Sequence, residues 1–168
     1  MVTSFAIVTY KSWYPYFHNY TNKEVSQKNP ADIDIRSVGF LDKFEKIGSV
    51  DQEMVLESGP LIVNFWASWC TPCVQETPDL IELTHRTPGL KILFVSGDSS
   101  QQEIISFLTS FKEMNGPNTR VIWDEKKELM SLFQVQLLPE SFIYDKDLKY
   151  KRHIKGAVDW KSLNLNDN

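Results

Sequence analysis

The sequence predicts an α/β domain with a central mixed β-sheet flanked by helices, preceded by an N-terminal extension. Three observations support this class. Residues 61–65 and 91–96 are short apolar runs of the kind found in strands that are covered on both faces. Segments with helical spacing of apolar residues follow each run, at 71–86 and 101–114. Near the C-terminus, two strand-like runs enclose the polar turn 145–147, which indicates an antiparallel hairpin.

The composition is that of one globular domain. The chain has 168 residues, of which 42% are apolar, and a net charge of −4. Residues 1–60 carry 6 basic and 8 acidic side chains, and residues 61–168 carry 12 and 14. This even, slightly acidic balance excludes the basic surface that nucleic-acid binding requires. With only 2 cysteines, a scaffold held by several disulfides is also excluded.

The first 34 residues are interpreted as an N-terminal extension or linker, and residues 35–168 as the folded domain. The apolar run 4–10 is too short to span a bilayer and lacks the features of a signal peptide. An aromatic cluster follows, either the remnant of a membrane anchor or a segment that docks on the domain: Trp13, Tyr14, Tyr16, Phe17 and Tyr20.

The remaining elements are read from apolar spacing and turn residues. One or two short strands are expected in residues 35–47, before the turn 58–60. Pro78 is expected to kink the helix 71–86. Further elements are expected as strands at 119–123, 141–144 and 148–154, and as helices at 125–133 and 159–165.

Cys70 and Cys73 are the candidate reactive residues. Cys70 lies at the start of the predicted helix, where free backbone N–H groups and the helix dipole favour a thiolate. Cys73 lies one turn further in and can form a disulfide with Cys70, so the pair can cycle between dithiol and disulfide. The alternatives are two unrelated thiols or half of a zinc site. Zinc needs two more ligands, and the three histidines lack ligand spacing.

Glu76 follows Cys73 by one helical turn, so the two side chains can share one side of the helix. A carboxyl group there can exchange a proton with Cys73, and burial would raise its pKa toward the working range. The alternative is a solvated glutamate that stabilises the first turn of the helix.

The motif Trp-Cys-x-x-Cys after an apolar strand resembles the active site of the thioredoxin fold family. Asn64, Glu76 and Pro78 make the resemblance closest to its extracytoplasmic TlpA/ResA-like and cytochrome-c-maturation members. It covers residues 61–154 and implies a thioredoxin-like fold. Asn64 replaces the aspartate of thioredoxin itself, which weakens any proton-relay role at that position and favours Glu76.

The resemblance also implies a substrate-binding surface around the cysteines. In this family, the proline corresponding to Pro139 is cis and packs against the sulfurs, which leaves the backbone of Leu138 free to pair with a bound peptide. Glu140 is similar to the glutamate of a Pro-Glu-Thr motif in cytochrome-maturation members. In this chain it is expected either to sort partners or to be a surface carboxylate. The neighbours of Cys70 are expected to complete the surface: Trp69, Thr71 and Pro72.

The expected function is that of a thiol–disulfide oxidoreductase that reduces specific extracytoplasmic protein disulfides. The resemblance implies a client such as apocytochrome c and electrons from a membrane thiol-transfer protein. A monomer without a cofactor or resident metal is expected. An alternative is a copper(I)-binding or metal-delivery module, although no methionine lies near the cysteine pair in sequence. A peroxidase of the peroxiredoxin group is disfavoured, because Ala67 replaces the threonine that it needs.

Overall fold

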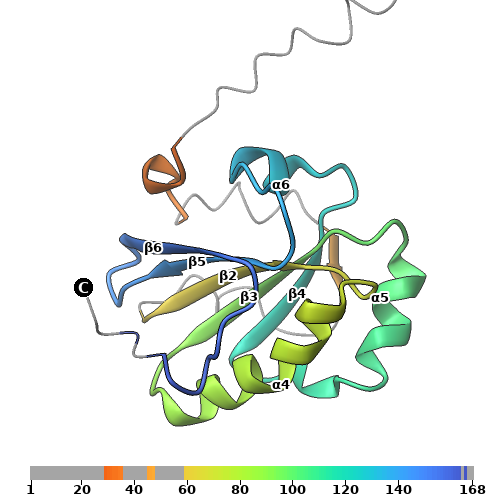
Figure 1. The fold of residues 1–168 in the computed structure, drawn as a ribbon, viewed down its shortest axis with the longest axis horizontal. Coiled ribbons are helices and arrows are strands. Elements are labelled where there is room, and N and C mark those ends of the chain that lie inside the picture. The colour runs from red at the N-terminus through yellow and green to blue at the C-terminus, as the bar shows by residue number, and fades with distance from the viewer. Residues whose placement is uncertain (1–28, 36–44, 48–58, 164, 166–168) are drawn as a thin grey trace, which may run out of the picture.

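The computed structural model describes residues 29–35, 45–47, 59–163 and 165. Their strands form one six-stranded sheet in the order β1-β4-β3-β2-β5-β6 (Figure 1). The pairs β2–β3 and β3–β4 are parallel, and the other pairs are antiparallel. This confirms the predicted mixed sheet. The strands are β1 (Glu45–Ile47), β2 (Leu61–Trp66), β3 (Lys91–Ser96), β4 (Thr119–Trp123), β5 (Glu140–Tyr144) and β6 (Tyr150–Lys155).

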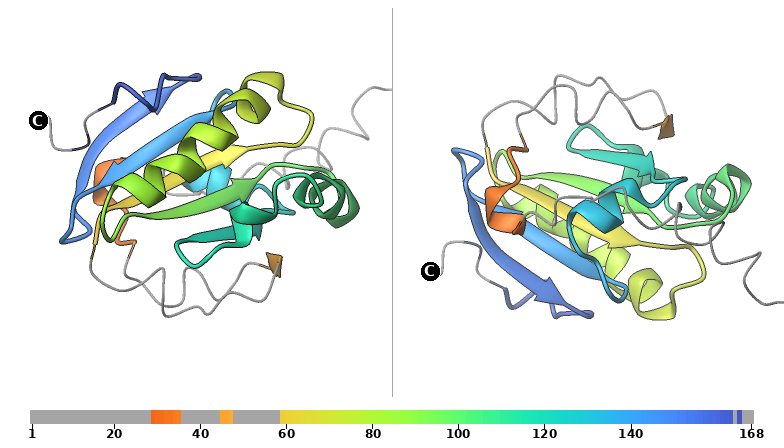
Figure 2. Two further views of the ribbon diagram at one scale, coloured as in Figure 1. Left: turned by 90° about the horizontal axis from the view of Figure 1, so that it is seen from below. Right: turned by 90° about the horizontal axis from the view of Figure 1, so that it is seen from above.

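Alternation along β2 divides its side chains between two hydrophobic cores. Ile62 and Trp66 belong to the core beneath α4 (Thr71–Arg86), whereas Val63 and Phe65 belong to the core on the opposite face. Figure 2 shows α4 across one face of the sheet, and α6 (Glu128–Leu132) and the 3₁₀ turn η2 (Pro30–Asp32) over the other. Because both faces are covered, β2 and β3 are apolar along most of their length.

Helix α4 has the predicted bounds and continues through Pro78. It is followed by β3 and then by α5 (Gln101–Leu108), which is shorter than the predicted helix 101–114. The reason is the change to 3₁₀-type bonding after Leu108: the N–H and the hydroxyl of Thr109 both donate to the carbonyl of Ser106. A separate 3₁₀ turn, η3 (Lys112–Asn115), follows.

Helix α6 is also shorter than predicted, because it begins at Glu128 and not at residue 125. Lys127 has a φ of 56°, in the left-handed region, which no α-helix can include. The buried carboxyl group of Asp124 accepts hydrogen bonds from the N–H groups of Leu129 and Met130 and so stabilises the start of the helix.

The predicted helix at 159–165 is wrong for the residues that the structure describes there, which form turns. Trp160 is completely buried, and its backbone carbonyl accepts a hydrogen bond from the guanidinium group of Arg86. Lys161 forms an ion pair with Asp79. Side-chain contacts therefore hold this segment along α4. Asp159 and its neighbours form turns and not a helix because the turns allow these contacts.

The described residues before β2 are few. Ile33 and Ile35 are buried in the core that faces α6. Of the strands predicted in residues 35–47, β1 is present and pairs with β4. Residues 1–28, with the aromatic cluster, and residues 36–44 lie outside the described residues. No helix in the described part of the chain is both long enough and apolar enough to cross a bilayer.

Candidate active site

Cys70 and Cys73 are joined by a disulfide at the N-terminus of α4. Cys70 is the N-cap residue, and its sulfur accepts the backbone N–H of Cys73 at 3.3 Å. Cys73 is almost completely buried, whereas Cys70 retains 5% of its surface. Because the sulfur of Cys70 caps the helix N-terminus and accepts the N–H of Cys73, the geometry favours negative charge there when the disulfide opens.

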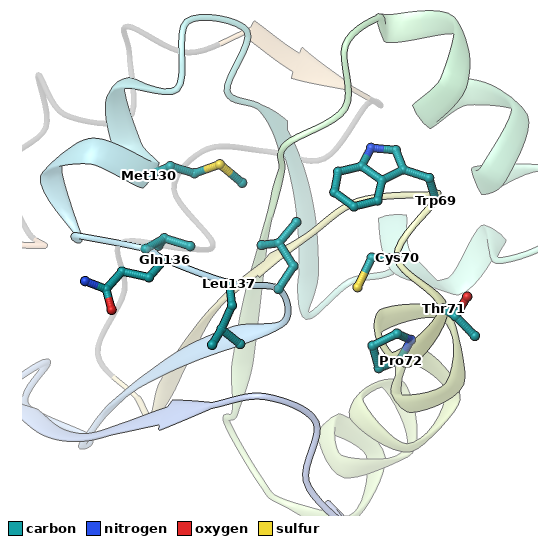
Figure 3. A pocket seen from close by; sticks show the side chains of 9 residues that line it. Trp69, Cys70, Thr71, Pro72, Met130, Gln136 and Leu137 are labelled. Atoms are coloured by element: carbon teal, nitrogen blue, oxygen red, sulfur yellow. The ribbon is translucent and has the colours of Figure 1, made fainter.

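A hollow of about 460 Å³ opens beside Cys70, and we call it the cysteine groove. One wall comes from the β2–α4 turn and the first turn of α4, and the other from α6 and the segment that leads into β5 (Figure 3). Trp69 and Leu137 are exposed large apolar side chains, at 66% and 47%, and both line the groove. The other lining residues are Thr71, Pro72, Met130, Val135, Gln136 and Leu138.

Glu76, three residues after Cys73 on α4, is the centre of a buried hydrogen-bonded network. Oε1 of Glu76 accepts from the side-chain amide of Asn64 at 3.0 Å, and Oε2 accepts from the indole N–H of Trp160 at 3.0 Å. The amide of Asn64 also donates to the hydroxyl of Ser141. Burial raises the pKa of Glu76, while the hydrogen bonds from Trp160, Asn64 and the backbone of Val158 partly offset that rise. Glu76 is 5% exposed, which excludes the solvated surface glutamate considered from the sequence.

Of the residues expected around the substrate, Trp69, Thr71, Pro72 and Leu138 line the groove, whereas Pro139 and Glu140 do not. Pro139 is buried, and the Leu138–Pro139 bond is cis. Glu140 is completely buried in β5, so it is not a surface carboxylate. Its carboxyl group accepts backbone hydrogen bonds from Gln136 and Leu137.

Asp98 is a buried residue of this region that the sequence reading missed. It follows β3, and its carboxyl group accepts hydrogen bonds from the N–H and hydroxyl of Ser68 and from the hydroxyl of Ser96. Ser68 lies in the β2–α4 turn, two residues before Cys70. Since β2 and β3 are parallel neighbours, their carboxyl ends meet, and Asp98 holds the turn that carries Trp69 and Cys70.

Trp160 was also missed, because the sequence offers no local sign of its partner 84 residues away. An isolated tryptophan near a C-terminus is normally read as one more core side chain. One signal in the sequence was available. A buried carboxyl group at Glu76 needs hydrogen-bond donors, and the neighbouring strand alone does not supply enough of them.

Residues 59–166 match the family model described as thioredoxin-like. The chain belongs to the thioredoxin-like family. The match contains the whole cysteine groove, the Glu76 network and the cis peptide bond. The assignment to this family is also consistent with the topology, in which β2 leads directly into the cysteine pair.

The thioredoxin-like relatives include thiol–disulfide exchange proteins. ResA of Bacillus thuringiensis subsp. konkukian, named a thiol-disulfide oxidoreductase, is 32% identical over 105 residues, which cover 61% of this chain and 58% of that protein. HelX of Rhodobacter capsulatus, named a thiol:disulfide interchange protein, is 37% identical over 97 residues, covering 58% of this chain and 52% of that protein. The chain thus spans little more than half of these relatives.

Solved structures show the same fold. StoA of Bacillus subtilis superposes with a TM-score of 0.53 at 24% identity, covering 62% of this chain and 79% of StoA. A DsbE-type thiol:disulfide interchange protein of Chlorobium tepidum superposes with a TM-score of 0.55 at 21% identity, covering 68% of this chain and 83% of that one.

Proposed function

We propose that this chain is a thiol–disulfide oxidoreductase that reduces specific extracytoplasmic protein disulfides, with apocytochrome c as a client. One observation carries the proposal: the Cys70–Cys73 disulfide sits at a helix N-terminus and faces a groove with exposed apolar side chains on both walls. Such a groove suits a peptide with apolar residues around its cysteines. The names of ResA and HelX support the class of reaction.

In the proposed cycle, the thiolate of Cys70 attacks one sulfur of the client disulfide. The S–S bond of the client breaks, its other sulfur leaves as a thiolate and takes up a proton, and a mixed disulfide forms. The thiol of Cys73 then loses its proton to Glu76 and attacks the sulfur of Cys70. The mixed disulfide breaks, the second client sulfur leaves as a thiolate and takes up a proton, and the Cys70–Cys73 disulfide returns. Two electrons have passed to the client, and a membrane thiol-transfer protein restores the dithiol.

The test is the equilibrium of the Cys70–Cys73 pair in a series of glutathione buffers. A potential well below that of glutathione is expected for a reductant. The reduced protein should also reduce a synthetic peptide that contains a Cys-x-x-Cys-His disulfide faster than a peptide of scrambled sequence. A potential above that of glutathione contradicts the direction, and equal rates with both peptides contradict the choice of client.

One observation favours a second candidate, the binding of copper(I). Met130 lines the same groove as Cys70, although it is 60 residues away in sequence (Figure 3). Thiolate and thioether sulfurs are the ligands that copper(I) prefers. If the reduced protein takes copper(I) from a chromogenic chelator under anaerobic conditions, Met130→Leu should weaken that binding. Equal affinity of the parent and Met130→Leu excludes the thioether as a ligand.

A further inference from the structure

We propose that Glu140 and His153 hold the groove loop, residues 136–138, in the form that binds the client. These two side chains would then determine affinity for a peptide disulfide without touching it. The inference rests on the proposed exchange of client disulfides at Cys70, and it concerns how the wall opposite that cysteine is positioned.

The carboxyl group of Glu140 holds the backbone of the groove loop. Its Oε1 accepts the backbone N–H groups of Gln136 at 2.9 Å and Leu137 at 3.0 Å, so two consecutive amides converge on one oxygen. Leu137 presents its exposed side chain to the groove (Figure 3). The position of this wall therefore depends on where the carboxyl group of Glu140 lies.

His153 in turn fixes Glu140. Its Nε2 is 2.5 Å from Oε2 of Glu140, and the histidine side chain is 19% exposed. The imidazole stacks on the ring of Phe142, with centroids 4.1 Å apart and an angle of 15° between the planes. Phe142 is itself buried in the core that faces α6. Packing thus sets the orientation of the imidazole, and the imidazole sets the orientation of the carboxyl group.

Lys155 at the end of β6 and Gly156 after it make two further contacts, one to the groove loop and one to Pro139 beside it. The N–H of Gly156 donates to the carbonyl of Pro139 at 2.8 Å, and Nζ of Lys155 donates to the side-chain oxygen of Gln136 at 3.2 Å. The lysine contact is exposed and contributes little. Removing the imidazole of His153 deprives a fully buried carboxyl oxygen of its partner, which is costly. The carboxyl group would then turn toward water and release the two loop amides.

The experiment compares His153→Phe with His153→Gln. Phenylalanine keeps the ring stacked on Phe142 but removes the nitrogen, whereas the glutamine amide can still reach Glu140. His153→Asn, whose amide is too short, is a second removal variant. His85→Phe is the matched control, because that histidine is exposed on α4 and contacts only Glu82 among the ion pairs of the described residues. Thermal unfolding identifies the variants that fold.

Two readouts are needed. Hydrogen exchange followed by NMR should show the amides of Gln136 and Leu137 exchanging about tenfold faster in His153→Phe, as expected when a hydrogen bond to a buried carboxyl group is lost. KM for a cyclic disulfide peptide should rise about tenfold, while the rate with 2-hydroxyethyl disulfide, which does not need the loop, stays at the parent value. His153→Gln should restore both readouts, and His85→Phe should change neither.

Unchanged exchange of the two amides in His153→Phe, or an unchanged KM, would refute the role of the pair. An equal loss of rate with both disulfides would also refute it, since that result indicates general damage to the site. If the parent protein reduces neither disulfide, the proposed function has failed. The exchange measurement would still show whether Glu140 and His153 hold the groove loop.

Discussion

Replacing Trp160 by phenylalanine tests whether the indole holds Glu76 in its buried position. The indole N–H donates to Oε2 of Glu76 at 3.0 Å, and the ring is completely buried. Phenylalanine fills most of the ring volume but has no donor. The substitution therefore removes one hydrogen bond to a buried carboxyl group and leaves a small cavity.

The expected magnitude has two parts. Loss of ring volume in a packed core costs about 1–2 kcal/mol. A hydrogen bond to a neutral acceptor contributes about 1 kcal/mol and one to a charged acceptor about 2 kcal/mol, so the loss is larger when Glu76 is ionised. The free energy of unfolding should fall by about 2–3 kcal/mol when Glu76 is protonated and by about 1 kcal/mol more when it is ionised. A domain with ordinary stability of about 5–15 kcal/mol remains folded.

The assay is urea unfolding of the parent and Trp160→Phe across the pH range. Burial raises the folded-state pKa of Glu76, so the stability that this group contributes is fully present below its unfolded pKa and is lost as pH rises through its folded pKa. Trp160→Phe raises the folded-state pKa of Glu76 further, because it removes the indole hydrogen bond that favours the charged form of the carboxyl group. The difference in free energy of unfolding between the parent and Trp160→Phe should therefore be constant below the folded-state pKa of Glu76 in the parent. Above that pKa the difference should grow. A difference that is the same at every pH would show that Trp160 acts through packing alone.

Three other predictions follow from the site. Alkylation of the reduced protein at mildly acidic pH should label Cys70 before Cys73, as judged by tandem mass spectrometry; preferential labelling of Cys73 would reverse their roles. Glu76→Gln should alter the pH profile of single-turnover client reduction, and superimposable profiles would exclude a proton-transfer role. Asp98→Asn should lower the free energy of unfolding by about 2 kcal/mol, because the carboxyl group loses acceptor capacity for Ser68; urea unfolding measures this, and a change below about 0.5 kcal/mol would contradict it.

Local sequence patterns predicted several parts of the site correctly. The continuous apolar run of β2 reflects a strand covered on both faces, and the change to helical spacing places Cys70 at the helix N-terminus. Asn64 is polar within that buried run, where a side-chain amide needs hydrogen-bond partners, and the structure supplies Glu76 and Ser141. These inferences succeed because the spacing of residues along one element depends mainly on that element.

The bounds of α5 and α6 and the turns around Trp160 depended on contacts that apolar spacing does not record. Apolar spacing alone predicts that α6 begins at residue 125, but the left-handed backbone of Lys127 prevents this. The carboxyl group of Asp124 stabilises the start of the helix after Lys127. Glu140 shows the same limit: its residue type was noticed, but its burial and its bond to His153 depend on the pairing of β5 with β6.

The sequence by itself determined the order of the elements from β2 to β6, the helix N-terminal position of Cys70 and the one-turn separation of Cys73 and Glu76. Only the tertiary structure decided what surrounds them: Trp160 against Glu76, Asp98 beneath the turn before Cys70, and Leu137 on the facing wall of the groove. The physical reason is that helical and strand periodicity act over a few residues. A buried polar group takes whichever partner the packing of distant elements brings within reach, and a single sequence does not specify that partner.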